Sequence, residues 1–426
     1  MKSKILFLWP PELPYDLTLH YHYTDFGEIA AYFLNQPDRY EVDIFDGGVL
    51  AYLKKEYVSY LLKEYDYLVI LTYIQNTHSA VRAAELCKKI SPKTKIIAYG
   101  SSPYYVPQFF EKESFDGYVW DGDWELAIES FIKYHNGEIT KENTKGICVD
   151  EGKIKNKGEW LDPAKWAFPP LDLLPLGDYD RVLSQKKTIK KFGDRQISVT
   201  VSRGCPFACP FCKASVMYGR QEKRRPVDQF IKYVEDNIDR FDVLQMFAPN
   251  FTLDQEWTKE FCQKVIDKKL KLDWRCTTRA QLITPELAEI MAKAGCKSIG
   301  IGVESLQDDI QKNIGKVLNT HQILDTFRTL KKVGIIPKGY IMLGLPGQTR
   351  EDVYETIRMI TKAGGEVRPS SYSPYQNLNR QSTLKEIAAM NRYTYDINAV
   401  KGLSPIEFLK IVFERDLEDH QHHYED

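Results

Sequence analysis

The chain reads QISVTVSRGCPFACPFC from Gln196 to Cys212. Apolar and polar side chains alternate over the first eight residues, which predicts a β-strand. Three cysteines follow with the spacing C-x3-C-x2-C, at Cys205, Cys209 and Cys212. A loop that follows the first strand of a β/α barrel lies at the carboxyl end of the strands, where such folds place their active sites. We therefore expect these cysteines to form the centre of the functional site.

The spacing of the cysteines favours an iron–sulfur cluster over zinc. Three thiolates in one loop can hold three irons of a four-iron cluster and leave the fourth iron open to bind another molecule. A structural zinc site normally has four ligands, often in two pairs, and no second pair follows at that spacing. The other cysteines are solitary, and we expect most of them to be small buried apolar residues in a reducing compartment. They are Cys87, Cys148, Cys262, Cys276 and Cys296.

Expected strands alternate with expected helices along residues 196–375. This alternation predicts a parallel sheet curved into a partial (β/α)6 barrel. The expected strands are QISVTVSR, VLQMFA, LDWRCTT, KSIGIGVE, KGYIMLG and RPSSYS. The expected helices lie near 228–239, 256–268, 285–294, 320–333 and 350–363. Residues 376–426 are expected to be mostly helical.

The same alternation in residues 1–140 predicts a second α/β domain, a Rossmann-like parallel sheet. Its first strand runs into Trp9-Pro10-Pro11 rather than G-x-G-x-x-G, so a dinucleotide site is not indicated. Residues 141–195 are interpreted as a short β-hairpin and a linker with four prolines.

Composition excludes several classes of protein. A chain of 426 residues with 43% hydrophobic residues can bury more than one core, which excludes a disordered chain. The 58 basic and 59 acidic residues leave a net charge of −1, so no general attraction to nucleic acid or membranes is expected. No apolar stretch is long enough to span a bilayer, and the start MKSKILFLWPPELP has no cleavage site. We expect a cytoplasmic protein without nucleic-acid or membrane partners.

The cysteine loop after the first strand of this partial barrel resembles that of the radical S-adenosylmethionine (SAM) superfamily. The resemblance covers about residues 196–375. It implies a [4Fe-4S] cluster whose open iron is chelated by the amino and carboxylate groups of SAM. Electron transfer then breaks the sulfonium bond and yields a 5′-deoxyadenosyl radical. A small-molecule substrate and an electron donor such as flavodoxin or ferredoxin are implied as partners.

The resemblance also implies a set of SAM-binding residues at the strand ends. The usual acidic residue for the methionine amino group is absent, so Asn250 and backbone carbonyls are expected to serve there. Two simpler interpretations stay open: GLPGQT as a turn with Thr349 capping a helix, and Glu304 as a core carboxylate paired with Arg279. The implied residues are Phe211, Asn250, Arg279, Glu304, Ser305, Gly344 and Leu345.

A Rossmann-like domain before such a barrel resembles the cobalamin-binding class of radical SAM enzymes. The D-x-H-x-x-G loop of many cobalamin proteins is missing, and His20 and His22 do not have its spacing. The pair of glycines usual near residue 100 in this class is reduced to Gly100 alone. The residues that the resemblance implies for cobalamin are Thr72, Tyr73, Asn76, Gly100, Ser101 and Ser102.

Three functions follow from these expectations. The first is cobalamin-dependent methylation of an unactivated carbon of a small metabolite or natural-product intermediate. The second is hydrogen abstraction without cobalamin, leading to dehydration, deoxygenation or rearrangement of a sugar or cyclitol, with Tyr73, Tyr104 and Tyr105 filling the crevice. The third is a structural iron–sulfur or zinc protein. Tyr372 and Tyr375 are candidate substrate contacts, and no catalytic acid or base can be assigned.

Overall fold

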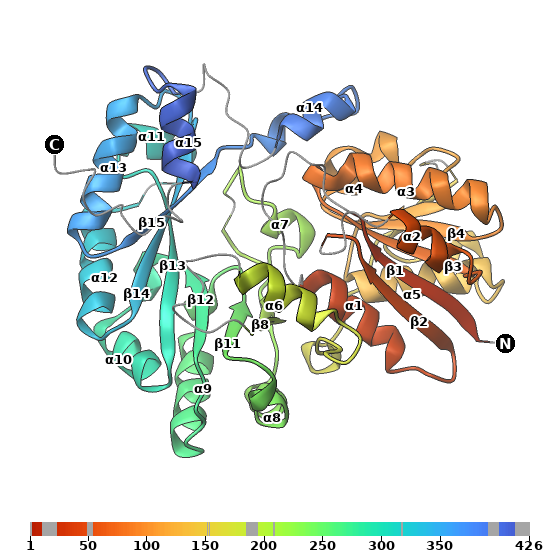
Figure 1. Ribbon diagram of the computed structural model, residues 1–426, viewed down its shortest axis with the longest axis horizontal. Helices are drawn as coiled ribbons and strands as arrows, with labels where there is room; N and C mark the ends of the chain where they lie inside the picture. The colour runs from red at the N-terminus through yellow and green to blue at the C-terminus, as the bar shows by residue number, and fades with distance from the viewer. Residues whose placement is uncertain are drawn as a thin grey trace. The chain divides into compact units, whose positions relative to one another are not determined.

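The computed structural model describes residues 2–10, 24–48, 54–150, 152, 154–184, 195–207, 209–316, 318–390 and 400–413. The chain forms two compact units (Figure 1). The first unit contains residues 1–182 together with two later segments, 213–222 and 374–391. The second unit contains residues 183–212, 223–373 and 392–426. His20 and His22 lie outside the described residues.

The first unit is built on a seven-stranded sheet with the order β2-β1-β3-β4-β5-β6-β7. The pairs from β2 to β5 are parallel, as predicted, whereas β6 pairs antiparallel with β5 and β7 antiparallel with β6. The hairpin predicted within residues 141–195 therefore extends this sheet and makes it mixed. The strands are β1 (Ser3–Trp9), β2 (Tyr40–Asp46), β3 (Tyr67–Thr72), β4 (Lys95–Gly100), β5 (Gly117–Val119), β6 (Ile147–Val149) and β7 (Ile154–Lys155).

Helices of the first unit follow its strands in the expected alternation. Two prolines lie at the starts of two short helical pieces around residue 105, so the chain forms α4 and then a 3-10 turn over Pro107–Phe109. The helices are α1 (Thr24–Leu34), α2 (Lys54–Leu61), α3 (Thr77–Ile90), α4 (Ser102–Tyr105), α5 (Trp124–His135), α6 (Leu176–Ser184), α7 (Ala214–Met217) and α14 (Leu384–Ala389).

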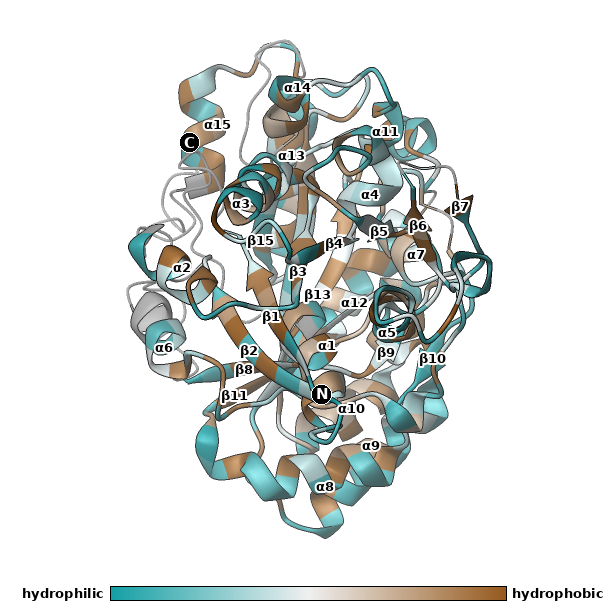
Figure 2. Cartoon of the chain, turned by 90° about the vertical axis from the view of Figure 1, so that its right-hand side faces the viewer, coloured by the Kyte–Doolittle hydropathy of each residue, from teal (hydrophilic) through white to brown (hydrophobic). Residues whose placement is uncertain are grey.

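The central strands of this sheet are buried along their length. Every residue of β3 is buried, as is all of β1 except Lys4. Continuous apolar strands of this kind are typical of parallel sheets with both faces covered. Figure 2 shows β1 largely in the brown of hydrophobic residues, whereas α8 (Val227–Asn237) in the second unit alternates brown and teal.

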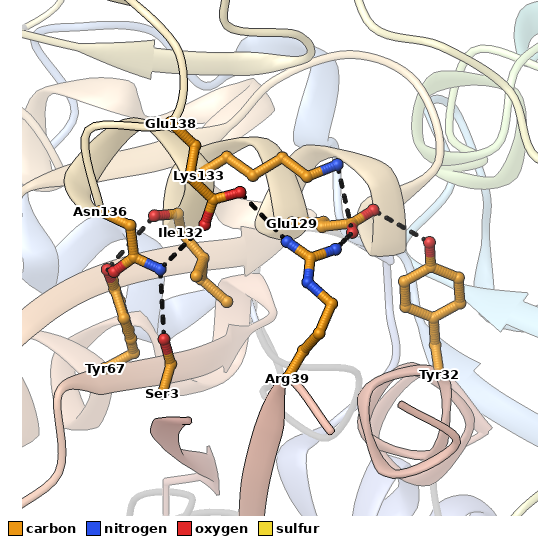
Figure 3. A network of polar contacts seen from close by, with 9 residues as sticks. All are labelled: Ser3, Tyr32, Arg39, Tyr67, Glu129, Ile132, Lys133, Asn136 and Glu138. Atoms are coloured by element: carbon orange, nitrogen blue, oxygen red, sulfur yellow. Dashed lines mark hydrogen bonds and ion pairs between the residues drawn. The ribbon is translucent and has the colours of Figure 1, made fainter. Parts of the chain in front are cut away.

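A network of polar contacts connects elements at the amino-terminal ends of the strands of the first sheet (Figure 3). The Glu129 carboxylate accepts hydrogen bonds from Tyr32 Oη at 3.0 Å and Arg39 Nη1 at 2.7 Å. Asn136 Nδ2 donates to Ser3 Oγ at 3.2 Å, at the start of β1. Ligands of open α/β sheets bind at the carboxyl ends of the strands, so we assign this network to structure.

The second unit carries a six-stranded parallel sheet with the order β15-β14-β13-β12-β11-β8. β8 and β15 are its edges, so the sheet is an open, partial barrel of the predicted kind. Its strands are β8 (Gln196–Thr200), β11 (Val243–Phe247), β12 (Trp274–Thr278), β13 (Cys296–Glu304), β14 (Ile336–Leu343) and β15 (Glu366–Ser371).

Helices α8, α9 (Gln255–Asp267), α10 (Pro285–Lys293), α12 (Thr320–Lys332) and α13 (Arg350–Lys362) connect these strands as the sequence predicts. The short α11 (Asp308–Asn313) after β13 was not expected, and α15 (Pro405–Phe413) lies in the expected helical tail. None of the described helices is long and apolar enough to cross a bilayer.

Candidate functional site

The cysteine loop leaves the barrel sheet through a sharp turn. After β8, residues Ser202–Arg203 (β9) pair antiparallel with Lys223–Arg224 (β10). Gly204 then adopts a φ of 87°, which residues with a side chain rarely adopt, and the chain turns into the loop. Cys205 is buried, whereas Cys209 and Cys212 are half-buried.

Two side chains from neighbouring strand ends reach the thiols of this loop. Asn250, three residues beyond β11, donates from Nδ2 to Cys205 Sγ at 3.3 Å. Arg279, directly after β12, donates from Nη1 to Cys209 Sγ at 3.8 Å. Burial raises the pKa of the Cys205 thiol, while the Asn250 hydrogen bond and the Arg279 charge act in the opposite direction. A cation and an amide donor beside the sulfurs favour the thiolate form that binds metal.

The cysteine loop stays the candidate metal site. Among the described residues, no three His, Cys, Asp or Glu side chains are grouped so that they could hold one metal ion. A cubane cluster differs from such a site in that each thiolate binds its own iron. Cys205, Cys209 and Cys212 therefore stay the predicted ligands of a [4Fe-4S] cluster.

Arg224 fixes the backbone beside Asn250. Its guanidinium donates to the carbonyl of Phe251 at 2.7 Å and to the carbonyl of Asn250 at 3.2 Å. It also lies 5.1 Å from the ring centroid of Trp257. These two carbonyls lie in the stretch expected to bind the SAM amino group, and they already accept protein hydrogen bonds. Sequence reasoning missed Arg224, although the pair Arg224-Arg225 before α8 was a visible signal.

Glu304, at the end of β13, is not paired with Arg279. Its carboxylate forms a buried ion pair with Lys316, whose Nζ also donates to the carbonyl of Gly302 at 3.0 Å. Glu304 has a φ of 63°, and the pairing of β13 with β14 shifts register between Gly302 and Glu304. A left-handed backbone at a residue other than glycine marks strain that the surrounding structure must hold. No sequence pattern indicated Lys316 as a partner of Glu304.

The turn after β14 is held by one glutamine. Gln348 Oε1 accepts from the backbone N–H of Gly344 at 2.8 Å and of Leu345 at 3.3 Å. Thr349 caps α13 in a reciprocal capping box with Asp352, so the simpler interpretation of GLPGQT is correct for this residue.

Ser305 likewise stabilises a turn, because its Oγ accepts from the Gln307 N–H at 3.2 Å and its carbonyl accepts from Gln311 Nε2 at 2.8 Å.

The structure brings three of the predicted residues into one apolar cluster. Phe211, from the cysteine loop, packs with Leu345 and Tyr372. The cluster is completed by Ile310, Ile314 and Met342. Tyr372 thus lies with two residues predicted for SAM, whereas Tyr375 belongs to the first unit. An apolar surface of this kind beside the cysteine loop suits the adenine that the resemblance implies.

The residues predicted for cobalamin lie at the carboxyl ends of β3 and β4. Asn76 Nδ2 and Ser101 Oγ are buried and have no hydrogen-bond partner among the described residues. Thr72 Oγ1 instead bonds the Tyr99 carbonyl at 2.9 Å, and Ser102 Oγ lies 2.8 Å from Thr77 Oγ1.

Gly100 has a φ of 108°, and a Cβ there would lie 2.3 Å from the Thr72 carbonyl oxygen, so the sheet itself requires this glycine. Two of the predicted side chains, Asn76 and Ser101, thus keep polar atoms that a ligand could satisfy.

Tyr73 belongs to a network around Asp25. Its hydroxyl donates to the Asp25 carboxylate, as does the hydroxyl of Tyr218 at 2.5 Å. Tyr99 Oη donates to the Asp25 carbonyl at 3.0 Å, and the Trp9 ring lies 5.4 Å from that of Tyr73. Tyr73 is therefore held in place by protein groups. Asp25 was missed, because nothing in its sequence surroundings indicates these partners.

The comparison with protein families identifies the barrel. Residues 199–360 match the model of the radical SAM superfamily. These residues form a radical SAM domain. The chain accordingly contains a radical SAM domain, a domain whose cofactors are SAM and a [4Fe-4S] cluster.

A curated relative matches this chain over most of its length. An uncharacterized methyltransferase of Pyrococcus horikoshii is 25% identical over 332 residues, which cover 76% of this chain and 70% of that protein.

Among solved structures, this chain is similar to the radical SAM methyltransferase TsrM from Kitasatospora setae, which was solved with its tryptophan substrate and a SAM analogue bound. The superposition has a TM-score of 0.69 at 12% sequence identity and covers 88% of this chain and 75% of TsrM. The cobalamin-dependent SAM radical enzyme OxsB also superposes with a TM-score of 0.69, at 19% sequence identity over 84% of this chain and 52% of OxsB. At these identities the likeness shows the fold, an α/β unit followed by a partial barrel.

Proposed function

We propose that this enzyme is a cobalamin-dependent radical SAM methyltransferase that acts on an unactivated carbon of a small metabolite or natural-product intermediate. The observation that carries the proposal is the pair of buried polar atoms, Asn76 Nδ2 and Ser101 Oγ, without partners among the described residues. Folded proteins rarely leave such atoms unpaired. They lie where open α/β sheets bind ligands, at the carboxyl ends of adjacent strands.

On the barrel side, the chain's residues hold and tune the cluster. When bound, a [4Fe-4S] cluster supplies the electron that cleaves SAM. Cys205, Cys209 and Cys212 would hold it, and the Asn250 and Arg279 donors would offset negative charge on its sulfur ligands. The apolar cluster around Phe211 excludes water beside this loop, as a reactive radical requires.

On the first-unit side, cobalamin supplies the methyl group when bound. The Asn76 amide would donate to its carbonyl groups, and the Ser101 hydroxyl can donate or accept. The two relatives named as methyltransferases support this reading of the chemistry. The proposal includes an electron donor such as flavodoxin or ferredoxin and a cytoplasmic location.

The cobalamin content of anaerobically purified protein tests the proposal. The protein is expressed with cobalamin supplied, and bound corrin is quantified by mass spectrometry after extraction. We expect near-stoichiometric corrin in the wild type and a lower content in Ser101→Ala, which removes a hydroxyl that makes no hydrogen bond to the described residues. Ser59→Ala, on the exposed face of α2, is the matched control and should retain corrin. Absence of corrin from a wild type that binds its iron would refute the proposal.

A second function is favoured by one observation, the fixed position of Tyr73. Its ring is buried, bonded to Asp25 and packed on Trp9, directly after β3, where an open α/β sheet would bind a ligand. This is the arrangement expected of an enzyme that abstracts hydrogen without cobalamin, for dehydration, deoxygenation or rearrangement. Such an enzyme would cleave SAM to 5′-deoxyadenosine while lacking corrin in the same measurement.

A further inference from the structure

Lys213 is the first residue after the cysteine loop and the N-cap residue of α7. Its ammonium lies over two tyrosine rings of the first unit, 5.2 Å from the centroid of Tyr73 and 4.8 Å from that of Tyr375. In the part of the chain that the structure describes, no carboxylate forms an ion pair with Lys213. Lys213 is thus a half-buried cation that lies over two aromatic faces and has no counter-ion among the described residues.

Both ends of this short helix are held in place. Tyr218, at the end of α7, donates to the buried Asp25 carboxylate at 2.5 Å. The same carboxylate accepts from the Tyr73 hydroxyl, so Asp25 positions one of the rings under Lys213 as well. These contacts form within the first unit and need no ligand.

The second ring is held by the segment that carries it. Tyr375 lies 6.0 Å from the ring of Tyr105. Arg380, five residues after Tyr375, forms a bidentate ion pair with Glu111, with Nη1–Oε2 and Nη2–Oε1 distances of 2.6 and 2.8 Å. Gln108 Nε2 also donates to the carbonyls of Asn379 and Ser382, at 3.1 and 3.2 Å. The Tyr375 ring is therefore placed by contacts remote from Lys213.

The aromatic faces attract the ammonium but carry no net charge. A cation that is partly removed from water is costly unless an anion compensates it. The half-buried Lys88 has such an anion, since it pairs with Asp116 at 2.7 Å. Lys213 has the preformed surroundings of a binding site but lacks that partner, so its anion is expected to come from outside the chain.

We propose that Lys213 binds an anionic oxygen group, a carboxylate or a phosphate, of the substrate, with the rings of Tyr73 and Tyr375 as the walls of the site. This inference rests on the proposed function, because it assumes a small-molecule substrate that reacts near the cluster. The Cα atoms of consecutive residues are about 3.8 Å apart. Lys213 directly follows Cys212, so a substrate anchored at Lys213 is held next to a predicted cluster ligand.

The test is equilibrium dialysis of the cluster-loaded full chain against radiolabelled inorganic phosphate, with SAM and hydroxocobalamin present at saturation. Loss of a charge-assisted hydrogen bond lowers affinity about tenfold or more. We expect that decrease for Lys213→Gln, whereas Lys213→Arg retains binding. Lys232→Gln, at an exposed position on α8, is the control that should match the wild type. Iron content of every variant reports whether it has folded.

Three outcomes would overturn the inference. Equal phosphate affinity of the wild type and Lys213→Gln would mean that Lys213 binds no anion. In a second dialysis without these cofactors, phosphate binding that is lost on addition of SAM would assign Lys213 to the SAM carboxylate, and binding that is lost on addition of hydroxocobalamin would assign it to the corrin phosphate. If the proposed function itself fails, corrin and methyl transfer are absent while phosphate binding at Lys213 is unaffected, so the two failures are distinguishable.

Discussion

The Asn250 amide donates a hydrogen bond to the Cys205 sulfur across 3.3 Å. Hydrogen bonds to ligand sulfurs stabilise the reduced, more negative state of an iron–sulfur cluster and so raise its reduction potential. We therefore predict that Asn250→Ala lowers the potential of the reconstituted cluster, and that Asn250→Asp lowers it further by adding a negative charge.

A redox titration followed by electron paramagnetic resonance measures this shift. Asn237→Ala is the control, because that amide bonds only to the Tyr233 carbonyl on α8. An unchanged or higher potential in Asn250→Ala would show that the amide does not stabilise the reduced cluster.

The buried ion pair between Lys316 and Glu304 makes a second prediction. Removal of one member of a buried pair leaves an uncompensated charge and typically costs about 3–5 kcal/mol. Lys316→Ala should therefore lower the free energy of unfolding by about that amount, and SAM affinity should fall with it because Glu304 is no longer held.

Chemical denaturation and SAM binding measure these effects. Lys312→Ala, which removes a surface pair with Asp309, should change stability by less than about 1 kcal/mol. A similarly small effect of Lys316→Ala would mean that the pair does not hold the end of β13.

His135, on α5, makes the first unit sensitive to acid. Burial lowers the pKa of its imidazole from 6.5 to about 4, and its Nε2 has no hydrogen-bond partner among the described residues. Between these two pH values the unfolded chain binds a proton that the folded chain does not. Stability is therefore expected to fall as the pH decreases from 6.5 towards 4, by up to about 1.4 kcal/mol per pH unit from this group.

His135→Phe keeps an aromatic ring beside Phe131, whose centroid lies 4.4 Å from that of His135, and removes the titration. Urea unfolding at several pH values between 4 and 7 should show a shallower acid dependence for this variant. Parallel curves for variant and wild type would exclude His135 as a source of the acid sensitivity.

Much of the fold could be predicted because its signals are local. Alternating strands and helices predicted the parallel part of the first sheet and the whole of the second, and the resemblance carried by the cysteine loop pointed to the radical SAM domain. Strands of two or three residues, β6 and β7, carry no usable period, so their place in the first sheet was missed. The short α4 and α11 were missed for the same reason.

The candidate site could be predicted only where one residue type at one spacing carries the chemistry. Cys205, Cys209 and Cys212 meet that condition. Lys316 does not, because its partner Glu304 is twelve positions away and meets it only when α11 folds back. Asp25 likewise finds Tyr218 across 193 positions of sequence. Such partners depend on tertiary packing, which no local pattern encodes.

The central claim is methyl transfer driven by SAM cleavage, and the nucleoside products of SAM test it most directly. Protein loaded with its cluster and cobalamin is incubated anaerobically with SAM, a reductant and candidate substrates, and the products are quantified by mass spectrometry. We predict 5′-deoxyadenosine together with S-adenosylhomocysteine in the wild type, and no 5′-deoxyadenosine in Cys209→Ala. Formation of 5′-deoxyadenosine without any S-adenosylhomocysteine would contradict methyl transfer, and absence of both would contradict the account as a whole.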